Sequence, residues 1–585
     1  MTNKEKRKIM NMDEIICSEQ ESSTRAKNRE EYSNNLKPYV REDAQNDFME
    51  MLKIAYDIQD LQAKMNMMGD EHLTESDLIM LDNYSKQSKE IYFRNTDSGW
   101  PFDFIYMYII DGIQVFDLEK VNIDEVAEQA GEIYEKTDNK IAVVDNYIDI
   151  LFFLSLAQKD RNETDKLEAT IDKMKKVIES SAYDRIKFFV KWIIEYVCDY
   201  EYFEYDEQME SDEKEKLQRE SNQKKFNNVV YVACQLIFKL VDINPSERAE
   251  YELLIKSLEN FKLYPEVIFI IMNIYQCVED IKYQLAVKDV SKYKFGHYTR
   301  GSVLQIFLKQ EDSKASYEIS GRTRLYNVRY MNDPEEGKII DKILGLRDNN
   351  NPGDKVESSP WFLMSLTTAL DELTMWSQYG ENAEGVCIEL KPDSFSKVNS
   401  IIDIKPFRYQ LPSSEKTKTM LNAKECLYRI CYLDYEALKK GEIVISELHN
   451  ELLKDDDVIN RVTNSLVQMK EILAFSYQLN HQIEEELLYD VNKLLEEIRY
   501  LFKSSGYYYE KEIRLLKYSE LKPDNDEIKI HSMSPAAKLY IERESPIQIN
   551  KIIFGPKFKE PENVTPLVHL LDNEIICVRS SQKFK

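Results

Sequence analysis

Residues 361–390 read WFLMSLTTALDELTMWSQYGENAEGVCIEL, and they indicate the fold class of the C-terminal half of the chain. Residues 361–367 are mostly apolar and predict a strand, residues 369–380 predict one short helix, and residues 385–390 predict a second strand. Strands and a helix that follow one another in so short a stretch are typical of a mixed α+β domain.

Further strands are predicted on both sides of this stretch, and each is rich in β-branched or aromatic residues and bounded by glycine or proline. Residues about 414–505, by contrast, show helical spacing. We therefore expect one α+β domain over residues 291–580 with a helical insertion at about 414–505. The flanking strands are GHYT (296–299), GYYYEKEIRLLKY (506–518), KLYIER (538–543) and INKIIFGPK (549–557).

The N-terminal half differs in its turn-forming residues. Residues 1–295 contain four of the 15 glycines and four of the 16 prolines, which are residues that long helices exclude from their interiors. Apolar residues recur there at helical spacing. The predicted helices, with short connections between them, cover about 43–68, 74–93, 103–116, 122–137, 140–159, 163–180, 184–205, 214–242, 246–262 and 265–288.

Helices of this length with short connections stack into antiparallel pairs, so we expect a solenoid-like helical array over residues 43–290. The arrangement is similar to tetratricopeptide-like arrays, although the sequence shows no regular copy of their consensus. Residues 1–42 are polar and predict a flexible N-terminal tail. The predicted fold class is therefore an all-α array followed by an α+β domain.

The composition argues against several functional classes. The chain has 585 residues and a formal net charge of -27, so broad electrostatic binding to nucleic acid or anionic lipid is not expected. The absence of GxGxxG and GxxxxGK[ST] motifs excludes the usual glycine-rich phosphate loops. The sequence has no CxxC or HExxH pair, so no metal site is predicted. It has no signal peptide and no apolar run of about 20 residues, so we expect a cytoplasmic protein without a membrane span.

Six segments of the C-terminal half together resemble a prokaryotic family catalogued as domain of unknown function 2971, whose members often carry helical repeats. The resemblance covers residues about 293–580 and implies no activity, because none is attached to the family. The segments are GHYT (296–299), NDPEEG (332–337), SLT with MWSQYG (365–380), GVCIEL (385–390), EKEIR (510–514) and IIFGP (552–556).

The order of these segments also resembles, more distantly, the ADP-ribosyltransferase fold. That fold carries a His or Arg on its first strand, a Ser or Tyr on a later strand, an aromatic helix and a glutamate on a late strand. The resemblance implies NAD as the substrate, Glu512, Glu510 and His297 as catalytic residues, and a second set as NAD-binding residues. This second set is His297, Thr299, Arg300, Ser365, Trp376 and Tyr379.

The residue types suit that chemistry. A carboxylate such as Glu512 stabilises the oxocarbenium character that develops when the nicotinamide–ribose bond breaks. Glu510 lies two residues earlier, so on a strand both carboxylates project from one face, and the second can deprotonate an acceptor. A neutral His297 can exchange hydrogen bonds with the ligand, and the rings of Trp376 and Tyr379 can stack against the pyridinium. An E-x-E pair combined with His is a mixed signature, because arginine-modifying members carry Arg at the first position.

Other interpretations of these residues stay open. His297 and Ser365 can be structural, Glu510 and Glu512 can pair across strands, and Trp376 and Tyr379 can be core residues. NDPEEG reads as a rigid turn in which Asp333 can also shape the pocket.

The functional hypotheses also stay open. The leading hypothesis is an NAD-dependent ADP-ribosyltransferase or NAD glycohydrolase, as in a bacterial toxin or phage-defence effector. Its helical array would recognise a protein partner, and the acceptor would be a protein or a nucleic acid. The alternatives are a non-catalytic nucleotide or metabolite sensor and a structural scaffold, and the chain can also form homo-oligomers.

Overall fold

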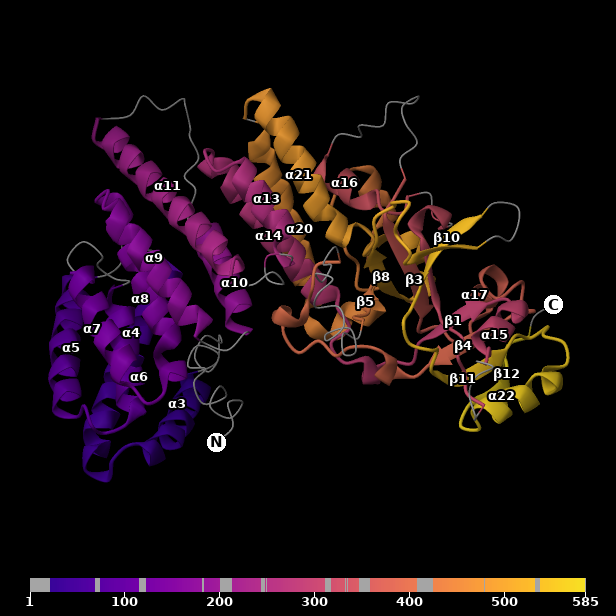
Figure 1. Cartoon of the computed structure of the whole chain (residues 1–585), viewed down its shortest axis with the longest axis horizontal. Helices are drawn as coiled ribbons and strands as arrows, with labels where there is room; N and C mark the ends of the chain where they lie inside the picture. Colours follow the sequence, from indigo (N-terminus) through magenta and orange to yellow (C-terminus); the bar gives the residue numbers. More distant parts are fainter. Residues whose placement is uncertain are drawn as a thin grey trace. The chain divides into compact units, whose positions relative to one another are not determined.

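The computed structural model describes most of the chain, and its residues fall into two compact units (Figure 1). The first unit comprises residues 1–190 and 202–243, and the second comprises residues 191–201 and 244–585. The described residues are 22–68, 74–114, 122–180, 184–199, 213–243, 248, 250–310, 317–331, 333, 335–346, 358–407, 425–477, 479–531 and 537–583.

The first unit is helical in its described parts, as the scarcity of glycine and proline predicts. Helix α10 (Asp184–Cys198) begins in this unit and ends in the second. Most of the observed helices differ from the predicted ones by a few residues at their ends, where helices fray and the apolar periodicity defines the boundary least well. The others are α3 (Ser22–Leu36), α4 (Gln45–Met68), α5 (Glu75–Arg94), α6 (Trp100–Gln114), α7 (Ile123–Lys136), α8 (Lys140–Asp160), α9 (Thr164–Glu179) and α11 (Glu213–Val241).

Helix α8 lies at the centre of this unit. It packs against α6, α7, α9 and α11, so it contacts helices that do not adjoin it along the chain as well as those that do. Among the described helices, α8 is the one long and apolar enough to cross a membrane, but 61% of its most apolar window is buried within the protein. Its apolar residues, such as Tyr147 and Phe152, are core residues of the helical unit.

The prediction of a flexible tail over residues 1–42 is wrong for its second part. Residues 22–36 form α3, and the side chains of Tyr32 and Leu36 are buried in the helical unit. Arg29 forms an ion pair with Asp60 of α4. Residues 1–21 lie outside the described part of the chain.

The second unit begins before the boundary predicted near residue 290. Helix α14 (Pro265–Leu285) follows α13 (Glu252–Asn260) and packs against α20 (Val458–Ser476) and α21 (His481–Arg499), which belong to the helical insertion. The insertion therefore has a helical neighbour within its own unit. Gln468 donates a hydrogen bond to Asn273 at 3.0 Å, and Lys282 forms an ion pair with Glu497 at 2.9 Å.

A mixed sheet forms the rest of this unit, in the order β12-β11-β4-β1-β3-β2-β10-β9, with β8 on the second edge of β3 and β5 beside β8. The short strands β6 (Cys431–Leu433) and β7 (Phe502–Ser504) pair separately. The strands of the main sheet are β1 (Gly296–Thr299), β2 (Arg324–Asn327), β3 (Trp361–Thr367), β4 (Val386–Leu390), β5 (Tyr428–Arg429), β8 (Glu512–Tyr518), β9 (Ile528–His531), β10 (Lys538–Glu542), β11 (Ile549–Phe554) and β12 (Ile576–Arg579).

The sheet splits along one edge of β3. Leu363 of β3 faces Tyr326 of β2, whereas Thr367 at the other end of β3 faces Gly296 of β1. On the opposite edge β3 pairs with β8 over its whole length. Residues 364–366 therefore lie between two strands that pair with the same edge, and this gap positions the candidate site.

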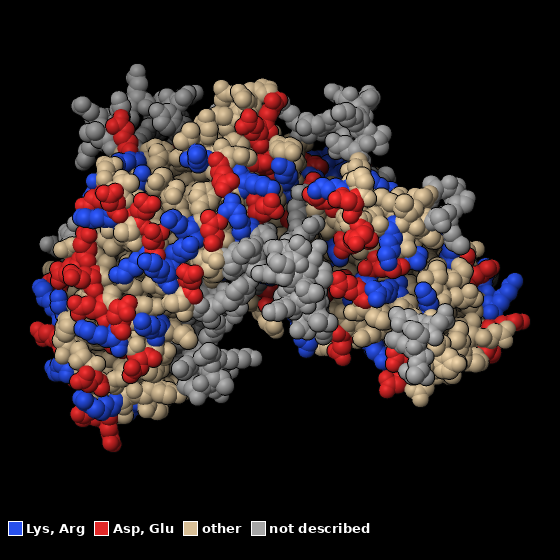
Figure 2. Space-filling view, viewed as in Figure 1, with Lys and Arg blue, Asp and Glu red and all other residues tan. Residues whose placement is uncertain are grey.

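The described surface carries charges of both signs. On the face drawn in Figure 2, Lys and Arg residues alternate with Asp and Glu residues, and the described residues form no continuous basic area there.

Candidate functional site

The imidazole of His297 lies in the gap of the sheet. Just after β3, Thr368 N–H donates a hydrogen bond to the Lys511 carbonyl across the β3–β8 pair. In β3 the backbone groups of even-numbered residues therefore face β8, and those of odd-numbered residues face the other edge. The carbonyl of Ser365 consequently faces the gap, where His297 Nδ1 donates a hydrogen bond to it at 3.0 Å. Because a carbonyl can only accept, this bond assigns the proton of a neutral His297 to Nδ1 and leaves Nε2 as an acceptor.

Burial favours the neutral form of this histidine. Desolvation lowers the pKa of His297, and the hydrogen bond to Ser365 offsets only part of that effect. A neutral imidazole can accept a hydrogen bond from a ligand hydroxyl or amide at Nε2 without bringing a charge into the cavity.

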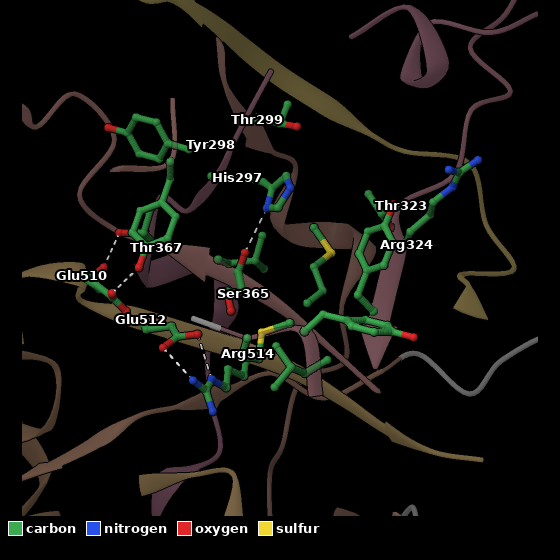
Figure 3. A pocket seen from close by; sticks show the side chains of 18 of the residues that line it. His297, Tyr298, Thr299, Thr323, Arg324, Ser365, Thr367, Glu510, Glu512 and Arg514 are labelled. Atoms are coloured by element: carbon green, nitrogen blue, oxygen red, sulfur yellow. Dashed lines mark hydrogen bonds and ion pairs between the residues drawn. The ribbon is translucent and has the colours of Figure 1, made fainter. Parts of the chain in front are cut away.

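A cavity of about 320 Å³ surrounds the gap (Figure 3). Its volume is at the lower end of the range for small-molecule sites. Six of the eight residues that the sequence assigned to catalysis or NAD binding line it, although they come from distant parts of the chain. These six are His297, Thr299, Ser365, Tyr379, Glu510 and Glu512.

Trp376 and Arg300 are not among the lining residues of this cavity. Trp376 on α17 (Leu373–Gln378) is fully buried in a small core, where its ring meets that of Tyr298 edge to face and its indole N–H donates to Asp371 at 2.7 Å. Arg300 is an exposed residue at the start of α15 (Gly301–Phe307). The aromatic residue of this segment that lines the cavity is Tyr379, which immediately follows α17.

Glu512 is the first residue of β8 and is 3% exposed. Arg514 donates to both of its oxygens, at 2.8 and 3.0 Å, and Lys503 Nζ lies 3.1 Å from Oε2. Burial alone would raise the pKa of Glu512, but the ion pairs with Arg514 and Lys503, together with a hydrogen bond from Ser365, lower it to about 2. Glu512 is therefore a carboxylate at neutral pH.

The sequence predicts Glu510 and Glu512 on one strand, but Glu510 lies before β8. It ends a 3-10 helix (Ser505–Glu510), and Lys511 between the two glutamates is left-handed, with φ 42° and ψ 55°. This left-handed residue turns the chain so that both carboxylates still reach Lys503, which lies 2.6 Å from Glu510 Oε2. A non-glycine residue in this conformation is strained, and such strain is frequent at functional sites.

The pKa of Glu510 moves in the opposite direction from that of Glu512. Burial raises the pKa of Glu510, and the negative charge of Glu512 adds to this effect against the opposing ion pair with Lys503. Tyr379 donates its hydroxyl to Glu510 Oε1 at 2.5 Å. The two carboxylates thus differ in their readiness to accept a proton.

Two basic residues of this site are not among the catalytic and NAD-binding residues predicted from the sequence. Lys503 on β7 bridges Glu510 and Glu512, and Arg514 pairs bidentately with Glu336, at 2.5 and 3.1 Å, as well as with Glu512. The sequence offers Arg514 as a phosphate-binding residue or, preferably, as a structural salt-bridge partner, and the structure shows it in ion pairs. No local motif marks Lys503, because its role depends on the pairing of β7 with β6 and on the turn before β8.

The NDPEEG segment contributes two carboxylates to the cavity, Asp333 and Glu336. Asp333 Oδ1 accepts a hydrogen bond from Glu335 N–H at 2.9 Å, which is the local backbone contact expected of an aspartate in a rigid turn. Asn332 and Pro334 lie outside the described residues. The cavity wall also includes the aromatic rings of Tyr326, Tyr330 and His531.

The chemistry of the site is that of charged side chains and hydrogen bonds. Within the described residues, no group of three or more His, Cys, Asp or Glu side chains is arranged to hold a metal ion. The acidic groups near the gap are instead neutralised by Lys503 and Arg514.

Comparison with known proteins identifies one family. Residues 375–515 match the family described as protein of unknown function (DUF2971), which confirms the predicted resemblance for this part of the chain. The matched segment contains Tyr379, Lys503, Glu510, Glu512 and Arg514, whereas His297 and Ser365 precede it. No curated protein and no solved structure matches the chain.

Proposed function

We propose that the C-terminal unit cleaves NAD, as an ADP-ribosyltransferase or an NAD glycohydrolase. The observation that carries this proposal is that His297, Ser365 and Glu512, which belong to three different strands, line one cavity. The resemblance to the ADP-ribosyltransferase fold required these residues to share a cleft despite their separation in sequence. The gap between β1 and β2 supports the same fold assignment, because it opens the sheet where the ligand would lie.

The ionised Glu512 suits the stabilisation of positive charge. When the bond between ribose C1′ and the nicotinamide nitrogen breaks, its electron pair leaves with neutral nicotinamide and the ribose gains oxocarbenium character. A carboxylate held ionised by Arg514 and Lys503 lowers the energy of that state. His297 Nε2 would accept a hydrogen bond from the ligand, and the ring of Tyr379 would lie beside the nicotinamide.

Glu510 suits the second step, in which an acceptor attacks C1′ and loses a proton. Its raised pKa makes it the better proton acceptor of the two carboxylates near neutral pH. In many active sites the environments of two carboxylates move their pKa values apart, so that one transfers protons and the other stays ionised. The acceptor would be water in a glycohydrolase and a nucleophilic group of a macromolecule in a transferase.

A second candidate function is nucleotide or metabolite sensing without catalysis. It is favoured by one observation: both oxygens of Glu512 and both oxygens of Glu510 already have partners within the protein. Such a fully paired network suits a rigid binding site. In either case we propose that the N-terminal helical unit, similar to a tetratricopeptide-like array, recognises a partner, as in a toxin or an antiviral effector.

The test is incubation of the full chain with NAD and measurement of free nicotinamide. We expect release by the wild type and a loss of at least 100-fold in Glu512→Gln, in line with the removal of one electrostatic contact to the transition state. The matched control is Glu389→Gln, since Glu389 is a 4% exposed glutamate on β4 that does not line the cavity. Tight NAD binding without release would favour the sensor, and absence of NAD binding would refute the enzymatic function and a sensor of NAD.

A further inference from the structure

The cavity contains one carboxylate oxygen that no described residue engages. Four acidic residues line the cavity: Asp333, Glu336, Glu510 and Glu512. Both oxygens of each glutamate accept from Arg514, Lys503 or Tyr379. Asp333 Oδ1 accepts from Glu335 N–H, but Asp333 Oδ2 is buried without a hydrogen-bond partner.

Burial makes this oxygen unusual. Asp333 is 6% exposed, and a buried carboxylate oxygen without a donor is unfavourable unless a ligand supplies one. A second lining residue, Thr323, is 1% exposed and also has a buried hydroxyl without a partner among the described residues. His297 Nε2 adds a further acceptor, because its Nδ1 donates to Ser365 (Figure 3). The cavity therefore offers at least two acceptors and one hydroxyl to a ligand with several hydrogen-bond donors.

We propose that Asp333 Oδ2 accepts a hydrogen bond from a ribose hydroxyl of the bound nucleotide, which makes Asp333 a ligand-binding residue. This inference rests on the proposed function for the identity of the ligand. A ribose carries adjacent hydroxyls that can reach more than one acceptor, and an aspartate that binds ribose hydroxyls is common in nucleotide sites. A hydroxyl also adds no charge to a cavity whose lining already includes three basic and four acidic residues.

The substitution Asp333→Asn tests this assignment without removing the turn. Asparagine keeps the oxygen that accepts from Glu335 N–H and forms the same local turn, but it replaces Oδ2 with a donating NH2 group. The matched control is Asp434→Asn, because Asp434 accepts from Glu436 N–H and Ala437 N–H in a similar local geometry and does not line the cavity.

The measurement is the dissociation constant, by calorimetry, for NAD, adenosine, nicotinamide riboside and analogues that lack single ribose hydroxyls. We expect Asp333→Asn to weaken riboside binding about 10- to 100-fold, as loss of a hydrogen bond to a charged group does, and Asp434→Asn to leave it unchanged. The analogue that lacks the hydroxyl bound by Asp333 should bind the wild type more weakly than the complete riboside by a similar factor. Asp333→Asn should bind this analogue and the complete riboside equally well.

Unchanged riboside binding by Asp333→Asn, or the same sensitivity to every hydroxyl as in the wild type, would overturn the assignment. If Asp333→Asn instead abolished binding of a guanidine such as agmatine and left riboside binding intact, Asp333 would belong to a cation site and the proposal would be wrong. Riboside binding with the expected pattern but no nicotinamide release would refute the enzymatic function alone. Absence of binding of any riboside to the wild type would refute both.

Discussion

Replacement of Lys503 by methionine should change both the stability of the protein and the pH dependence of NAD cleavage. Lys503 is buried, and its ammonium lies 2.6 Å from Glu510 and 3.1 Å from Glu512. Methionine has a similar length and no charge. The substitution therefore leaves two buried carboxylates near each other with Arg514 as the remaining cation of the network.

The expected magnitudes follow from this geometry. Removal of one partner from a buried ion pair costs about 3–5 kcal/mol of unfolding free energy. Lys503 also lowers the pKa of Glu510 in the native protein, so its removal should raise that pKa further. An opposite charge at this range shifts a pKa by about 1–3. Since Glu510 must be ionised to accept a proton, the acid limb of the activity profile should move to higher pH by about that amount.

The assay combines urea denaturation with nicotinamide release measured across pH. The matched control is Lys282→Met, because Lys282 is also fully buried and contacts two glutamates, Glu279 at 3.4 Å and Glu497 at 2.9 Å, but does not line the cavity. Both variants should lose similar stability, and only Lys503→Met should show the shifted profile. Lys503→Arg, which keeps the charge, should recover most of the wild-type profile.

Two outcomes would contradict this reasoning. If Lys503→Met cleaved NAD with the wild-type pH profile, Glu510 would not be the group whose ionisation limits the reaction. If Lys282→Met shifted the profile as much as Lys503→Met, the shift would reflect general destabilisation rather than the local charge. Measurements at a temperature at which all variants stay folded separate these cases from simple unfolding.

Three further predictions concern single side chains. Ion pairing outweighs burial and lowers the pKa of Glu512 to about 2. Ionisation of Glu512 should therefore contribute about 3 kcal/mol to the free energy of unfolding above pH 4.5, and this contribution should be lost as the pH falls toward 2. Denaturation measured across pH should show that Glu512→Gln lacks this dependence. Lys511→Gly should be about 1 kcal/mol more stable in urea than Lys511→Ala, because only glycine adopts φ 42° without strain, and equal stabilities would argue against strain there. Trp376→Ala should lower the unfolding free energy by about 3–5 kcal/mol, because the indole is a core side chain. If the variant instead kept its stability and bound NAD more weakly, the indole would contact the ligand.

Much of the fold follows from local sequence features. The scarcity of glycine and proline before residue 295 predicts the helical half, and strong apolar periodicity predicts helices such as α8 and α14 to within a few residues. The stretch 361–390 folds as predicted into β3, α17 and β4. These features depend on short-range spacing, which the sequence displays directly.

The boundary between the units depends instead on long-range packing. Residues 265–285 look like one more helix of the N-terminal array, but α14 packs against α20 and α21, nearly 200 residues later. Likewise, the pattern of α3 is polar, and its burial depends on a few residues such as Tyr32 and Leu36. The spacing of apolar residues predicts that a segment is helical, but it does not predict which other helix packs against its apolar face.

The candidate site shows the same division. Residue types and their order predicted a cluster of His297, Ser365 and Glu512, which line one cavity. The sequence did not predict Lys503, because its partners follow a turn that depends on the left-handed Lys511. It also placed Trp376 beside the ligand, whereas α17 directs this ring into the core formed with Tyr298. Which aromatic residue of a short helix reaches a cavity depends on how the helix is rotated, and sequence spacing does not fix that rotation.

The contact between β1 and β3 has one more consequence. The two strands meet at the residue pair Gly296 and Thr367, where an added Cβ atom on residue 296 would lie 2.8 Å from Leu370 and 3.0 Å from Cys387 and from the Ile388 carbonyl. The crowding comes from the side chain of Leu370 and from Cys387 and Ile388 of β4, which pairs with the other edge of β1. A methyl group introduced there is expected to shift these neighbours or β1 itself, and with β1 the imidazole of His297, while it leaves every reactive group chemically intact.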